Sequence, residues 1–204
     1  MISAQFLLTA FVVCAAPGTG VVYTLAMGLG RGRRAALAAA LGCTFGIVPA
    51  LLAAMLGLAA VLHASALLFN IVKLAGVAYL LWMAWGALQQ TGALAVRADR
   101  GTGSLTRVAW RGTVINVLNP KLSIFFLALL PPFLSGNPAS ATFEMAALGA
   151  VFMAITFGLF ALYGLFAGAL RDRVLGSERA VAWLNRAFAA VFAALAGRLA
   201  LERA

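Results

Sequence analysis

Long apolar runs, separated by short polar connections, divide the sequence into six segments. Each segment has about 20 residues or more, the length that an α-helix needs to cross an apolar layer about 30 Å thick. The pattern therefore predicts an all-α integral membrane protein. Its six transmembrane helices are expected near residues 4–28, 35–62, 67–89, 112–134, 142–170 and 181–201.

The connections between these segments alternate in charge. The second and fourth, at 63–65 and 135–140, contain no Lys or Arg, whereas the first, third and fifth are rich in arginine. The positive-inside rule places arginine-rich connections in the cytoplasm, so we expect a multi-pass protein with its N- and C-termini outside. The arginines of these connections are Arg31, Arg33, Arg34, Arg97, Arg100, Arg107, Arg111, Arg171, Arg173 and Arg179.

The third connection divides the chain into two halves with three segments each. We expect a first three-helix repeat at 1–90, a cytoplasmic linker at 91–111 and a second repeat at 112–204. A proline interrupts the first segment of each half, and the tripeptide Thr-Phe-Gly occurs at 44–46 and again at 156–158. Three segments per half invert the second half relative to the first. This 3+3 inverted repeat, with broken first and fourth helices, is typical of secondary transporters.

Composition agrees with a membrane location. The chain is 64% hydrophobic and 10% charged, with a mean hydropathy of +1.03, whereas soluble domains carry about 25% charged residues. No Lys or Arg precedes Arg31, so the first segment lacks the basic start of a secretory signal peptide and is expected to remain as a span. The net charge of +10 is concentrated in the connections, which favours anionic lipid head groups as partners and excludes nucleic acid.

The fourth segment contains costly polar groups at Asn116 and at Asn119–Pro120–Lys121. Asn is a strong helix N-cap and Pro is favoured at the first helical position, so we expect a second half-helix that begins at Pro120. All five acidic residues lie in loops or at segment ends. We therefore expect Lys121 to be an unpaired charge that binds a substrate carboxylate. The alternative is a proline kink in which Lys121 is neutral or bonded to carbonyl groups.

Pro17–Gly18–Thr19 is expected to break the first segment in a matching way. Pro17 leaves the carbonyl group of Val13 without its helical donor, and such a carbonyl group can accept from an ammonium group. We expect Pro17, Gly18, Thr19, Asn116, Asn119, Pro120 and Lys121 to bind the substrate. Thr44, Lys73 and Tyr79 are further candidates for the pathway or for ion coupling.

No catalytic triad, metal cluster or cofactor motif occurs in the sequence, so we expect neither an enzyme nor a cofactor. Cys14 and Cys43 are typical of small core residues, although a membrane thiol relay between them is one alternative function. Export of a metal cation by a related carrier is another. Small residues at a spacing of four, such as Gly42 and Gly46, favour close helix packing within the monomer, with a homo-oligomer interface as the alternative.

Taken together, these motifs resemble the LysE/RhtB family of amino-acid exporters. The resemblance extends over most of the chain and is most specific at Asn116–Lys121. The other residues that carry it are Pro17–Gly18, Gly30–Arg34, Leu41–Gly42, Gly46, Lys73, Gly76–Leu80, Gly86, Phe125, Phe126, Pro131 and Phe133. The resemblance implies an exporter of amino acids or similar metabolites in the bacterial inner membrane, driven by the proton gradient.

Two positions depart from the pattern of that family. Position 19 is Thr where the family usually has Pro, and Pro49–Ala50 stands where related sequences often have His. If that His carries protons in its relatives, this chain must use another group. The absence of acids from the membrane segments favours neutral or hydrophobic amino acids over lysine as substrates.

Overall fold

The chain is described by a computed structural model, which covers residues 2–64, 66–89, 98–99, 101, 103–170 and 177–201. Every regular element in these ranges is a helix, as predicted. Four of the arginines from which the topology is predicted lie outside the described residues: Arg97, Arg100, Arg171 and Arg173. The side chain of Lys73 also lies outside the description, although its backbone belongs to a helix.

The helices follow one another along the chain with few intervening residues. The elements are α1 (Ala4–Ala15), α2 (Thr19–Arg31), α3 (Arg33–Phe45), α4 (Val48–Ala64), α5 (Ala66–Gln89), α6 (Leu105–Val117), α7 (Pro120–Ile124), the π-helix η1 (Phe125–Leu129), the 3-10 helix η2 (Pro131–Phe133), α8 (Pro138–Leu165), α9 (Ala167–Leu170) and α10 (Glu178–Leu201).

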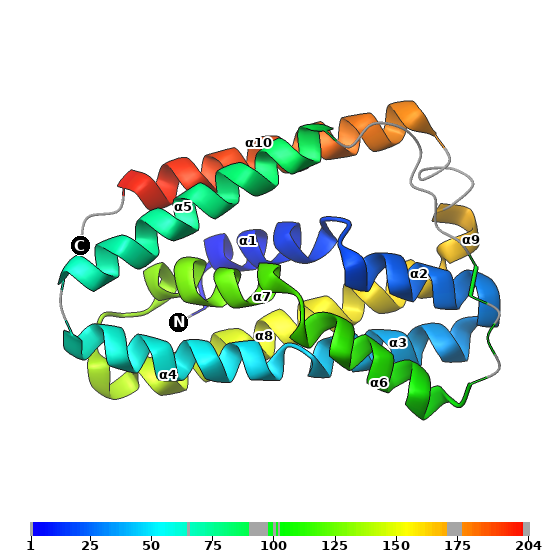
Figure 1. Cartoon of the computed structure of the whole chain (residues 1–204), viewed down its shortest axis with the longest axis horizontal. Coiled ribbons are helices and arrows are strands. Elements are labelled where there is room, and N and C mark those ends of the chain that lie inside the picture. Colours follow the sequence, from blue (N-terminus) through cyan, green and yellow to red (C-terminus); the bar gives the residue numbers. More distant parts are fainter. Residues whose placement is uncertain are drawn as a thin grey trace.

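Most helices lie roughly along the long axis of the molecule (Figure 1). The successive pair α1–α2, α5 and α8 run in one direction, and the pair α3–α4, α6–α7 and α10 return in the other. Helices α5 and α10 pack against each other along their length, and α3 packs against α6 and α8. Helices α1 and α7 lie in the middle of this view, with α5 above them and α4 below them.

Within the described residues, three helices are long and apolar enough to cross a membrane: Arg33–Gly57, Ala139–Leu165 and Glu178–Leu201. The pair α1 and α2 adds a fourth if the bent pair is counted as one span. Many large apolar side chains are exposed, including Leu56, Trp82 and Phe143. Exposed apolar surface of this extent fits contact with lipid, and the chain is an integral membrane protein.

The junction of α2 with α3 and the start of α6 lie toward the right-hand end of Figure 1, and described residues of the first and third connections contact each other. The Arg31 guanidinium donates to the carbonyl oxygen of Gly103, and the Asp99 amide donates to the carbonyl oxygen of Ala26 at 3.2 Å. Helix α6 begins at Leu105, inside the expected linker 91–111, because Ser104 caps it by accepting from the Arg107 amide.

A break in the second predicted span is not anticipated from the sequence. Helix α3 ends at Phe45 and α4 begins at Val48, with Gly46 and Ile47 between them. Pro49 explains the position, because it has no N–H group to donate to the carbonyl of Phe45 four residues earlier. The two pieces still form one continuous apolar stretch, Arg33–Gly57.

The stripe of small residues in α3 packs against α6 of the same chain, as the sequence favours. A Cβ atom at Gly42 would lie 1.9 Å from the carbonyl oxygen of Ala109, and one at Gly46 would lie 2.5 Å from that of Thr113. The Thr113 hydroxyl donates to the carbonyl oxygen of Gly42 at 3.0 Å. Backbone approach at this distance leaves no room for any side chain at Gly42, so α3 and α6 are held together within the monomer.

This packing predicts that Gly42→Ala destabilises the protein, although Ala is favoured over Gly in a helix by about 1 kcal/mol. The matched control is Gly158→Ala in α8, where an added Cβ meets nothing within 4 Å. In detergent, we expect the thermal midpoint, followed by size-exclusion chromatography, to fall for Gly42→Ala and not for Gly158→Ala. Equal midpoints for both variants would contradict the close packing of α3 on α6.

Candidate functional site

Two interrupted helices meet in the interior of the molecule. Helices α1 and α2 are bent by 58° at residues 16–18, where Ala16 and Gly18 have extended backbone conformations. Helix α6 ends at Val117 and α7 begins at Pro120, so residues 118–119 form the second break. The breaks therefore occur at the two prolines from which the sequence predicts them, because Pro cannot donate the helical hydrogen bond.

The start of α7 confirms the predicted cap. Asn119 has an extended backbone, its side-chain oxygen accepts from the Lys121 amide at 3.1 Å, and Pro120 is the first helical residue. The cap satisfies one of the free amide groups at this helix end. It also fixes Lys121 in the first turn of α7, close to the break in the other half of the chain.

Lys121 is not unpaired, which corrects one expectation from the sequence. Its Nζ atom donates to the carbonyl oxygen of Val13 at 2.6 Å and approaches that of Ala16 at 3.5 Å. Both carbonyl groups belong to the C-terminal end of α1, where the helix dipole favours a cation. Pro17 leaves the Val13 carbonyl without a donor in its own helix, and the lysine of the other half fills that place. The ring of Phe192 lies 6.0 Å from Nζ.

Asn116 lies beside this contact, at the end of α6. Its side chain is 2% exposed, and its Nδ2 group donates to the carbonyl oxygen of Cys43 at 2.7 Å. Its Oδ1 atom has no hydrogen-bond partner. Among the described residues, no other fully buried side-chain oxygen or nitrogen lacks one. A buried acceptor without a donor costs about 1–3 kcal/mol, so this oxygen marks a place where a ligand or a water molecule would be stabilising.

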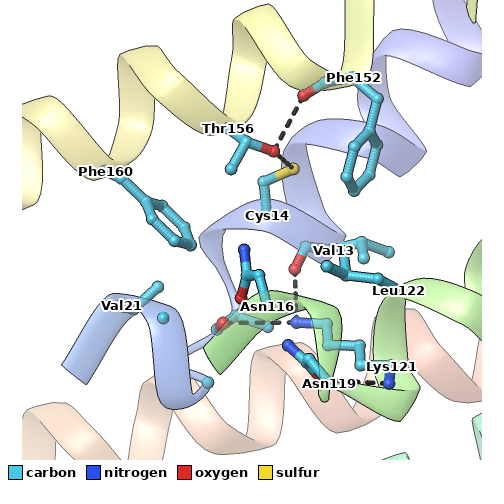
Figure 2. Close-up of a pocket in the computed structure, with 13 residues that line it drawn as sticks. Val13, Cys14, Val21, Asn116, Asn119, Lys121, Leu122, Phe152, Thr156 and Phe160 are labelled. Atoms are coloured by element: carbon cyan, nitrogen blue, oxygen red, sulfur yellow. Dashed lines mark hydrogen bonds between the residues drawn. The ribbon is translucent and has the colours of Figure 1, made fainter. Parts of the chain in front are cut away.

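A small cavity of about 30 Å³ lies between the two breaks. Figure 2 shows Asn116 and Lys121 on one side of it and Cys14 and Thr156 on another. The Cys14 thiol and the Thr156 hydroxyl lie 3.1 Å apart, and that hydroxyl also donates to the carbonyl oxygen of Phe152. The wall is completed by Val13, Ala16, Gly18, Gly20, Val21, Asn119, Leu122, Phe152 and Phe160.

A larger pocket of about 340 Å³ lies on the other side of Lys121, between the breaks and the α5–α10 pair. Its volume falls within the range of about 300–1,000 Å³ that is usual for small-molecule sites. Lys121 and Asn119 line both cavities. The residues around the larger pocket are Ala16, Pro17, Gly18, Thr19, Tyr79, Trp82, Met83, Gly86, Ala87, Asn119, Pro120, Lys121, Asn185, Phe188 and Phe192.

The structure brings most of the predicted substrate residues together. Pro17, Gly18, Thr19, Asn119, Pro120 and Lys121 line the larger pocket, and Asn116 lines the smaller cavity. Of the pathway candidates, Tyr79 lines the larger pocket, with its ring 5.4 Å from that of Trp82. Thr44 lines neither cavity, and its hydroxyl donates to the carbonyl oxygen of Ala40 within α3. The side chain of Lys73 lies outside the described residues.

Sequence reasoning missed the wall that α10 contributes. Asn185 is 3% exposed, and Asn185, Phe188 and Phe192 follow one another at a helical spacing along the pocket. The available signal was Asn185, a single amide within an otherwise apolar helical face. Tyr163 was missed as well. Its hydroxyl donates to the carbonyl oxygen of Ala15 at 2.9 Å and so holds the end of α1 from α8.

Comparison with known proteins gives one family match and several similar exporters. Residues 11–203 match the family described as LysE type translocator. A homoserine/homoserine lactone efflux protein of Salmonella typhimurium is 28% identical over 97% of this chain and 95% of its own length. A leucine efflux protein of Enterobacter sp. is 26% identical, covering 96% and 93%. A threonine efflux protein of Salmonella typhi is 28% identical, covering 92% and 91%. No solved structure matches the chain.

The Asn119 cap predicts a difference between two small substitutions. Asn119→Ala removes the acceptor of the Lys121 amide and should cost about 1 kcal/mol, whereas Asn119→Ser keeps a capping oxygen. Thermal unfolding in detergent should therefore show a lower midpoint for the Ala variant and a nearly unchanged one for the Ser variant. The assignment of Asn119 as a cap fails if the two variants unfold alike.

Proposed function

The chain belongs to the LysE type translocator family, and we propose that it is a secondary transporter that exports amino acids or closely related small metabolites. Relatives that cover nearly the whole chain are named as efflux proteins for homoserine, leucine and threonine. One observation supports a location for the substrate site. Lys121 contacts the carbonyl groups of Val13 and Ala16, between two cavities, where two broken helices meet.

The proposed architecture is a 3+3 inverted repeat, with residues 1–90 and 112–204 as its halves and the linker 91–111 between them. The meeting of the α1–α2 break with the α6–α7 break supports it, because transporters of this plan bind substrate where discontinuous helices face each other. The proposed membrane is the bacterial inner membrane. The contacts of Arg31 with Gly103 and of Asp99 with Ala26, which join the first and third connections, support a cytoplasmic location for that end, with both termini outside.

The proposed substrates are small neutral amino acids. The larger pocket is lined by aromatic and apolar side chains with the amides of Asn119 and Asn185, and no acidic residue is part of its wall. A cationic side chain such as that of lysine would lie near the Lys121 ammonium without a compensating charge. Polar contacts from Thr19 and the two amides suit a short hydroxyl group as well as an alkyl chain.

Export is proposed to be coupled to protons. Lys121 supports this part of the proposal because it is a titratable side chain placed between the two cavities. Intramembrane ionisable groups with such a position are usual in proton relays. Coupling is tested in proteoliposomes, where an imposed pH gradient should drive amino-acid movement and a protonophore should abolish it.

The two alternative functions are less well supported than amino-acid export. For a thiol relay, Cys14 would have to react with Cys43, but its thiol is in contact with the Thr156 hydroxyl and both thiols are buried. For a metal-cation exporter, the relatives described above give no support, because they are named as efflux proteins for homoserine, leucine and threonine.

The decisive experiment compares Lys121→Met with the wild-type protein in cells that overproduce each of them. Wild-type cells should tolerate raised concentrations of leucine, threonine or homoserine dipeptides and export the released amino acid. Lys121→Met removes the donor of this partly buried hydrogen bond. A hydrogen bond to a charged group contributes about 1.5–3 kcal/mol, so the variant should export slower by a factor of roughly 10 or more. Immunoblots of membranes check that both proteins are present equally.

The matched control is Arg111→Met, which removes one positive charge from an exposed pair with Asp99, 3.8 Å away. This variant should export at the wild-type rate. Full export by Lys121→Met would remove Lys121 from the site. No change in tolerance for any of the three amino acids would contradict the proposed substrates.

A further inference from the structure

We propose that Lys121 is an internal substitute for the ammonium group of the substrate. Without substrate, Lys121 occupies the acceptor site at the end of α1. When an amino acid binds, its own ammonium group takes this site, and the displaced Lys121 pairs with the carboxylate of the same molecule. The site then selects ligands that carry both groups. This inference rests on the proposed function as an amino-acid exporter.

Two carbonyl oxygens contact the Lys121 ammonium group, and the same cavity has a third acceptor group in its wall. An ammonium group has three N–H donors. The carbonyl oxygens of Val13 and Ala16 lie 2.6 Å and 3.5 Å from Lys121 Nζ, and Asn116 Oδ1 is a third oxygen on the same cavity. That third oxygen has no partner in a side chain that is only 2% exposed. Lys121 thus fills this site incompletely, and a better placed ammonium group would gain an acceptor (Figure 2).

Lys121 and the carbonyl groups that it contacts belong to different helices. Its backbone is fixed by the Asn119 cap at the start of α7, whereas its acceptors belong to α1. The contact is therefore made by a flexible four-carbon side chain between two separate helices. Such a contact can be exchanged for another by rotation of the side chain, with no change in the cap or in the carbonyl groups.

Donors for the carboxylate are open on the opposite side of the first break. The first three amide groups of α2, at Thr19, Gly20 and Val21, have no acceptor within their helix, and Gly18 provides no capping side chain. Gly18 and Gly20 line the small cavity together with Asn116, whose unpartnered oxygen would lie 3.0 Å from a Cβ atom on Gly20. The amides of α2 and the released Lys121 ammonium together suit a carboxylate.

Each half of an amino acid alone is predicted to bind poorly. An amine that displaces Lys121 leaves a second positive charge without a partner in a buried site. A carboxylate that draws Lys121 away leaves the acceptor oxygens without donors. Only a zwitterion does both exchanges at once. The selected class is therefore neutral α-amino acids with a free carboxylate, and homoserine should be preferred over homoserine lactone, which has the ammonium group but no carboxylate.

The test uses matched ligands on the purified full-length protein. Leucine is compared with 3-methylbutylamine, which lacks the carboxylate, and with 4-methylpentanoate, which lacks the ammonium group. Binding is followed by tryptophan fluorescence, since Trp82 lines the larger pocket. Wild-type protein should bind leucine at least about tenfold more tightly than either fragment, because a site built for hydrogen bonds rejects ligands that leave its polar groups unpaired.

The Lys121→Met variant should bind the amine fragment more tightly than the wild-type protein does. Its acceptor site is vacant, so 3-methylbutylamine should bind at least about fivefold more tightly than to wild-type protein, while leucine binds more weakly. The control ligand is (3-methylbutyl)trimethylammonium, which keeps the charge and has no N–H donors. A gain for the primary amine alone supports the carbonyl site. An equal gain for both amines reflects only the loss of repulsion and overturns the inference.

A second measurement needs no variant. In wild-type protein, 4-methylpentanoate should strengthen the binding of methylamine, and methylamine should strengthen that of 4-methylpentanoate by the same factor. The carboxylate pairs with the Lys121 that the amine displaces, and the amine donates to the oxygens that Lys121 leaves. Independent binding of the two fragments overturns the inference. If threonine, 1-amino-2-propanol and 3-hydroxybutanoate replace the leucine set, the same relations should hold.

Failure of the inference and failure of the proposed function give different results. Leucine or threonine that is bound and exported, with identical amine binding in wild-type and Lys121→Met proteins, overturns the exchange of ammonium groups and leaves export intact. Absence of both binding and export for leucine and for threonine overturns the substrate assignment, and the inference fails with it.

Discussion

The contact between Lys121 Nζ and the carbonyl oxygen of Val13, at 2.6 Å, connects the second half of the chain to the first. Pro17 creates the need for it by removing the helical donor of Val13. Asn119 and Pro120 make it possible by starting α7 at the position from which Lys121 reaches α1. A charged group at membrane depth is tolerated where it binds backbone carbonyl groups. The break in one half thus stabilises the lysine of the other.

Close backbone packing places the groups around this contact. Asn116 can lie at the cavity because Gly46 leaves room for it: a Cβ atom at Gly46 would be 2.7 Å from that of Asn116. On the other side, Gly20 leaves room for the Asn116 oxygen and for Phe160. Glycine at these points is therefore explained by the approach of neighbouring helices to Asn116. Stripes of small residues in a membrane chain thus serve the site as well as the packing.

The locally determined features could be predicted from the sequence. The all-helical membrane fold follows from apolar length, and the breaks at Pro17 and Pro120 and the Asn119 cap follow from the chemistry of a few neighbouring residues. The partner of Lys121 could not be predicted, since it depends on how distant helices pack. The sequence has no acid near Lys121, which suggested an unpaired charge. The acceptors are backbone carbonyl groups, which a sequence does not distinguish from any others.

The wall that α10 contributes to the pocket could not be predicted for the same reason, because it also depends on how distant helices pack. Asn185 stands out as a lone amide, but nothing in the sequence indicates that α10 packs along α5 and faces the two breaks. Even the Thr-Phe-Gly repeat was informative only in part. Both threonines donate to the carbonyl oxygen four residues earlier, at Ala40 and at Phe152. Only Thr156 lines the small cavity, so equivalent local structure in the two halves does not give equivalent positions at the site.

The internal acceptor contact also bears on the empty transporter. A carrier that exports substrate must return without it, and a vacant site with bare acceptors and a free buried charge would make that step costly. Under the proposed exchange, Lys121 satisfies the Val13 and Ala16 carbonyl groups whenever substrate is absent. The occupied and empty proteins then differ little in the number of unpaired polar groups, so neither state is strongly favoured over the other. A lysine that leaves its carbonyl groups only for a zwitterion thus accounts for selection and for the return of the empty carrier by the same hydrogen bonds.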